Sequence, residues 1–408
     1  VCISACGSDF KANTNAGCGF YAVDLDNAID TSSGQTVDAW NAQFAVIASN
    51  TSETQSATVT VTLPDGTSQI KEVGPLSLET FTLPAIYGQD NTKRSFSAFK
   101  VDATQPITVY QFNPLSNTGV FSNDASVLLP ADGLGNEYYA MSHRQIADKF
   151  RGFVTIVGIS EATTQVEITP TAPTLAGGAD LPALAIGQKH TFTIEQGEVV
   201  NIESNQDGSD LTGTHIVGDG PIAVFSGHEA AVTSDKCCAD HLEQQMVPVK
   251  AWGNEYVLTR SMERGLESDW FRVLAAEDGT TIQVNPAVTN PPIQNLNAGM
   301  FIEFPADSHF TVKANKPIMV AQFLASSQEV NAGGTALCIE AADCPVGYEC
   351  FLGNCFPPSC ASAADCGSGH TCADGQCQPI GDPALILAVP KEQWRKNYVF
   401  LSPNSYAE

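Results

Sequence analysis

Cysteine is the residue whose number and spacing carry the most chemistry in this sequence. Eight of the 13 cysteines form two tandem cassettes, each with the spacing C-x5-C-x5-C-x4-C. The first cassette holds Cys338, Cys344, Cys350 and Cys355, and the second holds Cys360, Cys366, Cys372 and Cys377. Too few apolar residues lie between these cysteines to form a core, so we expect two disulfides to staple each cassette.

The same spacing argues against a zinc site. Structural zinc ligands usually come in C-x2-C or C-x4-C pairs, whereas both cassettes use five-residue spacings. Each cassette allows three disulfide connectivities, among which sequence does not choose. We favour the interleaved pattern, in which the first cysteine pairs with the third and the second with the fourth.

Five cysteines lie outside the cassettes: Cys2, Cys6, Cys18, Cys237 and Cys238. An odd number cannot pair completely among themselves. At least one of them is therefore free, pairs beyond this stretch of chain, or joins another molecule. We expect the two adjacent cysteines to have separate partners rather than a vicinal bond.

Three further residues of reactive type surround the adjacent cysteine pair, namely His228, Asp240 and His241. We predict that they lie in a disulfide-stapled, solvated loop and form a candidate binding loop, because loops on a rigid scaffold are where binding residues concentrate. A metal centre here is the less favoured alternative, so we predict no metal site.

No catalytic constellation stands out, and we predict that the protein is not an enzyme. The segment from His228 begins like H-E-x-x-H, but Val232 stands where the second histidine must be. Ser226 lacks the first glycine of a nucleophile elbow. We predict no cofactor. Ca²⁺ is the one ion left open, because Asn205–Asp210 resembles part of a calcium loop without its bidentate glutamate.

The composition excludes two classes of partner. A net charge of −26 disfavours nucleic acid, whose phosphates need Lys and Arg. No stretch approaches the roughly 18 apolar residues of a spanning helix, so we predict no membrane insertion in this segment. The chain starts at Val1 without a signal peptide. Together with the cysteines, this predicts a processed, exported chain, located outside the cell or on its surface.

A repeated motif organises the rest of the sequence. Asn136–Ser142 recurs as Asn254–Arg260 and as Asn397–Ser402, with a weaker copy at Gly19–Val23. The aligned aromatic residues are Phe20, Tyr138, Tyr256 and Tyr398. A second motif, around Pro106, Pro221 and Pro317, predicts a strand, a tight turn at the proline and a second strand. The third interval is longer than the others because the cassette pair is inserted there.

These intervals set the domain boundaries that we predict. Residues 1–19 form a cysteine-containing segment, and 20–130 and 131–248 form β repeats 1 and 2. Residues 249–390 form repeat 3 with the disulfide-rich insertion 338–377, and residues 391–408 begin a truncated fourth repeat.

Alternating apolar and polar residues, abundant Thr and Val, and Asp-Gly turns predict an all-β protein. We expect tandem antiparallel β-sandwich-like repeats with a small disulfide-rich insertion, and a β-propeller is the alternative. Trp252, Trp270 and Trp394 lie at or beside repeated strands, which favours packing in the core over sugar binding.

The segment Cys238–Pro248, followed by Trp252–Tyr256, resembles a signature of the IgGFc-binding protein N-terminal domain family: Cys, Asp-His-Leu, a Glu-Gln pair and Trp-Gly before an aromatic strand. Trp270–Val284 and Cys18–Asn27 are also similar to it. This resemblance implies an extracellular, non-enzymatic protein of surfaces or mucus. The bacterial members of this family are large secreted or surface proteins, and the tandem cassettes resemble those found in such proteins. Fc binding is implied only by the name of the animal member.

We therefore expect a non-enzymatic extracellular structural or adhesive surface protein, including the subunit of a bacterial appendage or filament. The alternative is a glycan- or protein-binding module that acts through the cysteine-rich loops. The expected partners are other copies of the chain, or a glycan or protein of the extracellular surface.

Overall fold

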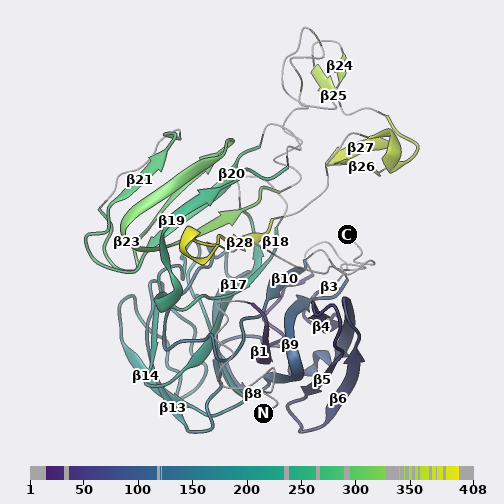
Figure 1. Ribbon diagram of the computed structural model, residues 1–408. Helices are drawn as coiled ribbons and strands as arrows, with labels where there is room; N and C mark the ends of the chain where they lie inside the picture. Colours follow the sequence, from purple (N-terminus) through teal and green to yellow (C-terminus); the bar gives the residue numbers. More distant parts are fainter. Residues whose placement is uncertain are drawn as a thin grey trace.

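The computed structural model describes residues 15–31, 36–116, 120, 122–233, 239–262, 267–288, 295–326 and 383–394. In the cysteine-rich region it describes 340, 344, 349–351, 354–356, 359–366, 370–373 and 375–379. The predicted fold class is confirmed, because the described residues form antiparallel sheets with only short 3-10 turns between them. They show no propeller arrangement (Figure 1).

Unit 1 contains two four-stranded sheets that share one long strand, β9 (Phe99–Asn113). The first sheet has the order β6 (Ser68–Val73), β5 (Ala57–Thr62), β9, β1 (Gly17–Ala22). The second has the order β7 (Ser77–Leu83), β4 (Phe44–Asn50), β9, β10 (Asp124–Val127). The alternation of β5 buries one face of the first sheet, whereas β4 is buried along its whole length.

Unit 2 repeats this pairing, with the long strand divided into β16 (His215–Gly218) and β17 (Ile222–Ala231). Its first sheet is β14 (His190–Ile194), β13 (Thr164–Thr169), β16, β11 (Glu137–Tyr139). Its second sheet is β15 (Glu198–Glu203), β12 (Gly152–Gly158), β17, β18 (Asp240–Gln245). A strand of unit 1, β8 (Lys93–Phe96), extends the second sheet by pairing with β15.

Unit 3 has the same plan around β23 (Phe310–Phe323). The first half of β23 pairs with β19 (Gly253–Leu258) and β21 (Ile282–Asn285). Its second half pairs with β20 (Asp269–Ala275) and β28 (Leu385–Leu387), and β20 pairs with β22 (Phe301–Ala306). The remaining elements are a hairpin of β2 (Ile29–Asp30) and β3 (Val37–Asp38), with η1 (Ala85–Tyr87), η2 (Val249–Ala251) and η6 (Lys391–Gln393).

The sequence motifs occupy equivalent places in the three units. Phe20, Tyr138 and Tyr256 are all buried, and they pair with Val101, Ile216 and Val312 on the long strands. The prediction of a tight turn at the proline holds only in unit 2. Pro106 and Pro317 lie within continuous strands, at the point where the strand leaves one sheet for the other. Proline has no N–H to donate, so it is tolerated where pairing changes.

The units are joined by shared hydrophobic cores. In unit 2, Val154 and Ile156 face the core of their own unit, whereas Phe153 and Val157 on the same strand join the core of unit 1. In unit 3, Leu274 of β20 and Met319, Ala321 and Phe323 of β23 likewise join the core of unit 2. The second sheet of each later unit is therefore covered on both faces. This explains why the central strands β12 and β17 are buried along nearly their whole length rather than on alternate residues.

The cassettes form an insertion between β23 and β28, which are neighbouring strands of one sheet. Its two ends meet where the Leu324 N–H donates to the Ala384 carbonyl at 3.1 Å. Each cassette contains one short hairpin, and these are β24 (Glu349–Phe351) with β25 (Asn354–Phe356) and β26 (His370–Ala373) with β27 (Gln376–Pro379). A 3-10 turn, η5 (Ala363–Asp365), precedes the second hairpin. Figure 1 shows both hairpins projecting from the body of the molecule.

Candidate functional site: a polar seam between units 1 and 2

The predicted solvated loop is wrong for the three residues named for it. His228 lies in β17, Asp240 and His241 open β18, and all three are buried. β18 is polar in sequence because its open edge faces side chains of β10 rather than water or the backbone of another strand. Cys237 and Cys238 lie outside the described residues.

The facing strands β10 and β18 form what we call the polar seam: Asp124, Ser126, Asp240, His241, Glu243 and Gln245, with Gln111 of β9. Asp124 Oδ2 accepts from the Glu243 N–H at 3.0 Å, and Ser126 Oγ accepts from the Gln245 N–H at 2.8 Å. In return, Asp240 Oδ1 accepts from the Asn123 N–H at 2.9 Å. Side chains thus satisfy strand-edge groups that would otherwise be unpaired, which is costly in a buried place.

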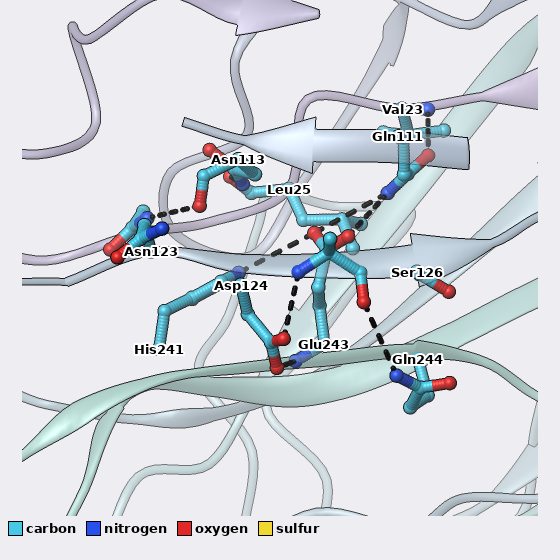
Figure 2. A network of polar contacts seen from close by, with 12 residues as sticks. Val23, Leu25, Gln111, Asn113, Asn123, Asp124, Ser126, His241, Glu243 and Gln244 are labelled. Atoms are coloured by element: carbon cyan, nitrogen blue, oxygen red, sulfur yellow. Dashed lines mark hydrogen bonds and ion pairs between the residues drawn. The ribbon is translucent and has the colours of Figure 1, made fainter. Parts of the chain in front are cut away.

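Glu243 is the most enclosed acid of the polar seam. Gln111 Nε2 lies 3.3 and 3.4 Å from its two carboxylate oxygens, and Gln111 Oε1 accepts from the Val23 N–H at 3.1 Å (Figure 2). Gln111 therefore links the long strand of unit 1, the segment after β1 and the last strand of unit 2. Burial raises the pKa of Glu243 well above its ordinary value.

The pKa values of Asp124 and His241 in the seam are shifted in opposite directions. Burial and the neighbouring Glu243 raise the pKa of Asp124 to about 7. Burial lowers the pKa of His241 to about 4, so its ring is neutral at pH 7. The 3.5 Å approach of His241 Nε2 to Glu243 is therefore not an ion pair. Instead, the ring lies nearly parallel to Phe153, with 6.0 Å between centroids.

His228 is a structural residue of β17. Its Nδ1 accepts from the Ala230 N–H at 3.1 Å, which leaves Nε2 to donate to the Arg144 carbonyl at 3.0 Å. Burial lowers the pKa of His228 to about 3. Both ring nitrogens are engaged with backbone, so this histidine is neither a ligand nor a base in this state.

A second acidic cluster lies beside the seam and is the one carboxylate group among the described residues whose oxygens could share a metal ion. One oxygen from each of Asp26, Glu203 and Glu229 lies within 4.8 Å of the others. Burial first, and then neighbouring carboxylates, raise the pKa of Asp26 and Glu229 well above their ordinary values. Asn201 Nδ2 faces Asp26 at 3.4 Å, and Arg151 Nε lies 3.7 Å from Glu203. Such oxygens suit Ca²⁺. A proton shared between two of these carboxylates would also relieve the repulsion between their charges. Sequence reasoning missed this cluster, because its members lie on three separate elements.

Units 2 and 3 meet around a buried arginine instead. Arg272 of β20 pairs with Asp210 at 2.8 Å and with Glu303 at 2.6 Å. It also donates to the Ser142 carbonyl at 2.7 Å and to Thr212 Oγ1 at 2.8 Å. Burial alone would raise the pKa of Asp210, but Arg272 holds it down at about 2. These buried charges compensate one another at the contact between units 2 and 3.

The cysteines form disulfides where the structure describes them. Cys360 pairs with Cys372 and Cys366 with Cys377, which is the interleaved pattern favoured from the sequence. Cys18, Cys344 and Cys350 are also disulfide-bonded. The sulfurs of Cys360, Cys366 and Cys377 lie close together, but as disulfides they are not thiolate ligands for zinc. Cys2, Cys6 and Cys338 lie outside the described residues, and the side chain of Cys355 is not described.

The comparisons with known proteins place the chain in a family. The family model described as "IgGFc binding protein" matches residues 124–408, more than half of the chain. The chain therefore belongs to this family. It is 25% identical over 260 residues to the human protein named "IgGFc-binding protein"; the match covers 64% of this chain and about 4% of that protein's length. No solved structure matches the chain. None of the described helices is long and apolar enough to cross a membrane.

Proposed function

We propose that this chain is a non-enzymatic extracellular structural protein of adhesive kind, whose rigid β body holds the cysteine cassettes out as a protein-binding module. Membership of the family supports an extracellular binding or structural role. Two buried histidines support the non-enzymatic part, because both are neutral at pH 7. His228 is bonded to backbone on both ring nitrogens, and His241 of the seam packs on the ring of Phe153.

One observation carries the binding part of the proposal. The insertion leaves and re-enters the sheet at adjacent residues, Phe323 and Leu385, so the ladder of unit 3 closes without it. Its second cassette is held together by two interleaved disulfides. An elaboration of this kind, placed at a loop of a closed framework, is typical of a binding element.

The proposal is tested by replacing residues 338–377 with a short Gly-Ser linker. Immobilised human IgG Fc, Fab as its matched control, purified mucin and a glycan array are the probes. We expect the variant to keep its melting temperature to within a few degrees and to lose all binding that the intact chain shows. Retained binding would place the site elsewhere, and collapse of the fold would make the cassettes structural.

A finer variant tests whether binding depends on the folded shape of the second cassette and not only on its presence in the chain. Removing the Cys366–Cys377 disulfide by the double substitution Cys366→Ser and Cys377→Ser should loosen the second cassette. Such a small loop is worth about 2 to 3 kcal/mol of cross-link stabilisation. We expect weaker binding with the melting temperature of the body unchanged.

A further inference from the structure

The contact between units 2 and 3 has an apolar part and a polar part. In the apolar part, Trp252 packs against Tyr139 with 5.8 Å between ring centroids, and it is buried as predicted. The same prediction is wrong for Trp394, which is 50% exposed because no described unit packs on it. Only the polar part contains groups whose charge changes with pH.

The polar part is built on a hook of consecutive residues of unit 2. The Ser142 carbonyl accepts from Arg272 Nη1 of β20 at 2.7 Å. Two residues further on, Arg144 Nη2 donates to Glu303 Oε1 of β22 at 2.7 Å. His143 lies between these two anchors, so its place in the chain holds it at the contact with unit 3.

The ring of His143 is enclosed, with 6% of the residue exposed. It lies edge-on to Phe323 of β23, with 5.4 Å between centroids, and edge-on to His228 of β17, with 6.4 Å. Its Nδ1 has no hydrogen-bond partner among the described residues. Both nitrogens of a protonated ring carry a hydrogen, so the N–H at Nδ1 would be buried without an acceptor, which is costly.

The charges around His143 balance as long as its ring is neutral. Arg272 pairs with Asp210 at 2.8 Å and with Glu303 at 2.6 Å. Arg144 pairs with Glu303 at 2.7 Å. Each carboxylate is thus already shared with an arginine, and a positive His143 would add an excess charge to a buried contact.

The pKa of His143 reflects these surroundings. Burial first, and then the positive charge of Arg272, lower the pKa of His143 well below its ordinary value, and Asp210 does not offset them. The neighbouring His228 is held neutral, because its Nδ1 accepts from the Ala230 N–H at 3.1 Å.

The closed contact therefore loses stability in acid. Once the units separate, the His143 ring is hydrated and its pKa returns to about 6.5. Below pH 6.5 the open contact binds a proton that the closed contact excludes, until the pH reaches the lowered pKa of the closed contact. The contact keeps its full stability above pH 6.5, and this stability decreases as the pH falls below that value.

We propose that the contact between units 2 and 3 is an acid-sensitive junction, in which proton uptake by His143 releases unit 3, and the cassettes that it carries, from unit 2. Protonation of buried histidine is a general way to open an interface in acid. At neutral pH the balanced charges hold the units as one body. In acid, this contact opens before the units themselves unfold. The junction belongs to the body and does not depend on whether the cassettes bind a partner.

Hydrogen exchange of the full chain, measured by mass spectrometry, tests the proposal because amide exchange reports local opening. Two amides report on the junction: the Gly213 N–H donates to the Ala140 carbonyl at 2.9 Å, and the Ser142 N–H to Thr212 Oγ1 at 3.0 Å. Amides of β5 in unit 1 are the reference. After correction for the intrinsic effect of pH on exchange, we expect the junction to open up to about tenfold more often for each pH unit below 6.5. The β5 amides should stay protected.

Three variants identify the group that senses acid. His143→Phe keeps a ring against Phe323 but cannot take up a proton, so its junction should lose this increase. Arg144→Gln removes a positive neighbour at an exposed position, where the fold should tolerate it, and should make the increase smaller. The matched control is His190→Phe, the same substitution at a partly exposed histidine of unit 2, and it should keep the full increase.

Circular dichroism at pH 7 confirms that each variant is folded, and Arg144→Gln decides alone if His143→Phe is not. A His143→Phe junction that opens as steeply in acid as that of the unaltered chain would overturn the proposal. The same holds for an Arg144→Gln junction with an unchanged increase, and for an unaltered junction that stays closed down to pH 4. If the junction and β5 amides lose protection together, the contact does not open on its own and the proposal fails.

Discussion

At the scale of single residues, one buried hydroxyl fixes the entry of each later unit. Tyr138 Oη donates to the Ile222 carbonyl at 2.8 Å and accepts from the Gly135 N–H at 2.8 Å. We expect Tyr138→Phe to lower the free energy of unfolding by about 1 to 3 kcal/mol, because it leaves a buried N–H unpaired. The ring itself should still fit, since Phe20 holds the equivalent place. Chemical denaturation measures the loss, and the half-buried Tyr110→Phe should cost almost nothing.

The titration of the polar seam is a second residue-scale property. Asp124 has its folded pKa raised to about 7, so between pH 4 and 7 the folded state keeps a proton that the unfolded chain has released. Its contribution to stability is therefore lost as pH rises through 7. As the pH is raised from 5 to 8, we expect the free energy of unfolding of Asp124→Asn to increase relative to that of the unaltered chain by about 1 to 2 kcal/mol. This figure is reduced to allow for the partial exposure of Asp124.

His241 should show the opposite dependence on pH. Its folded pKa is lowered to about 4, so between pH 6.5 and 4 the unfolded chain binds a proton that the folded state does not bind. The free energy of unfolding therefore decreases as the pH is lowered through this range. His241→Phe keeps an aromatic ring against Phe153. Its free energy of unfolding should increase relative to that of the unaltered chain as the pH is lowered from 6.5 to 4. Denaturation midpoints at a series of pH values compare the two variants. Parallel curves for both would show that neither group titrates as its surroundings require.

At the scale of elements, the close approach of β17 and β18 depends on a residue without a side chain. A Cβ at Gly227 would lie 1.7 Å from the Leu242 carbonyl oxygen and 2.9 Å from the ring of Phe153. Because the first obstacle is backbone, we expect Gly227→Ala to cost about 3 kcal/mol or more. Gly220→Ala is the matched control, since a Cβ there meets its nearest atom at 3.4 Å. Equal thermal stability of the two variants would contradict the close strand contact.

The elements also show what the sequence could and could not predict. The repeated aromatic and proline motifs place β1, β11 and β19 against the long strands, because strand pairing within a unit is encoded by local alternation. The polar run Asp240–Gln245 looked like a loop because its partners come from far away: Asp124 bonds to Glu243 across 119 residues. No local pattern reveals that a polar strand edge will be buried by a neighbouring unit. The same holds for the pairing of β8 with β15.

At the scale of the whole molecule, the shared cores make the three units depend on one another. Phe225 of unit 2 lies fully buried in the core cluster of unit 1, and Phe323 of unit 3 lies in that of unit 2. Units linked in this way resemble stacked repeats, whose interfaces supply much of their stability. The described body should therefore unfold as one cooperative transition rather than as three independent domains.

Calorimetry tests this cooperativity, with the disulfides left intact. We expect a single peak whose calorimetric enthalpy matches the van't Hoff enthalpy. Phe225→Ala removes a large side chain from the contact between units 1 and 2 and should cost about 3 to 5 kcal/mol. Because the cost is shared, the variant should shift the single peak to lower temperature. If the peak instead split, with one part unmoved, the units would be separate domains on a flexible string. The cassettes would then be fixed to unit 3 alone and would move relative to units 1 and 2, so this measurement also bears on how the protein presents them to a partner.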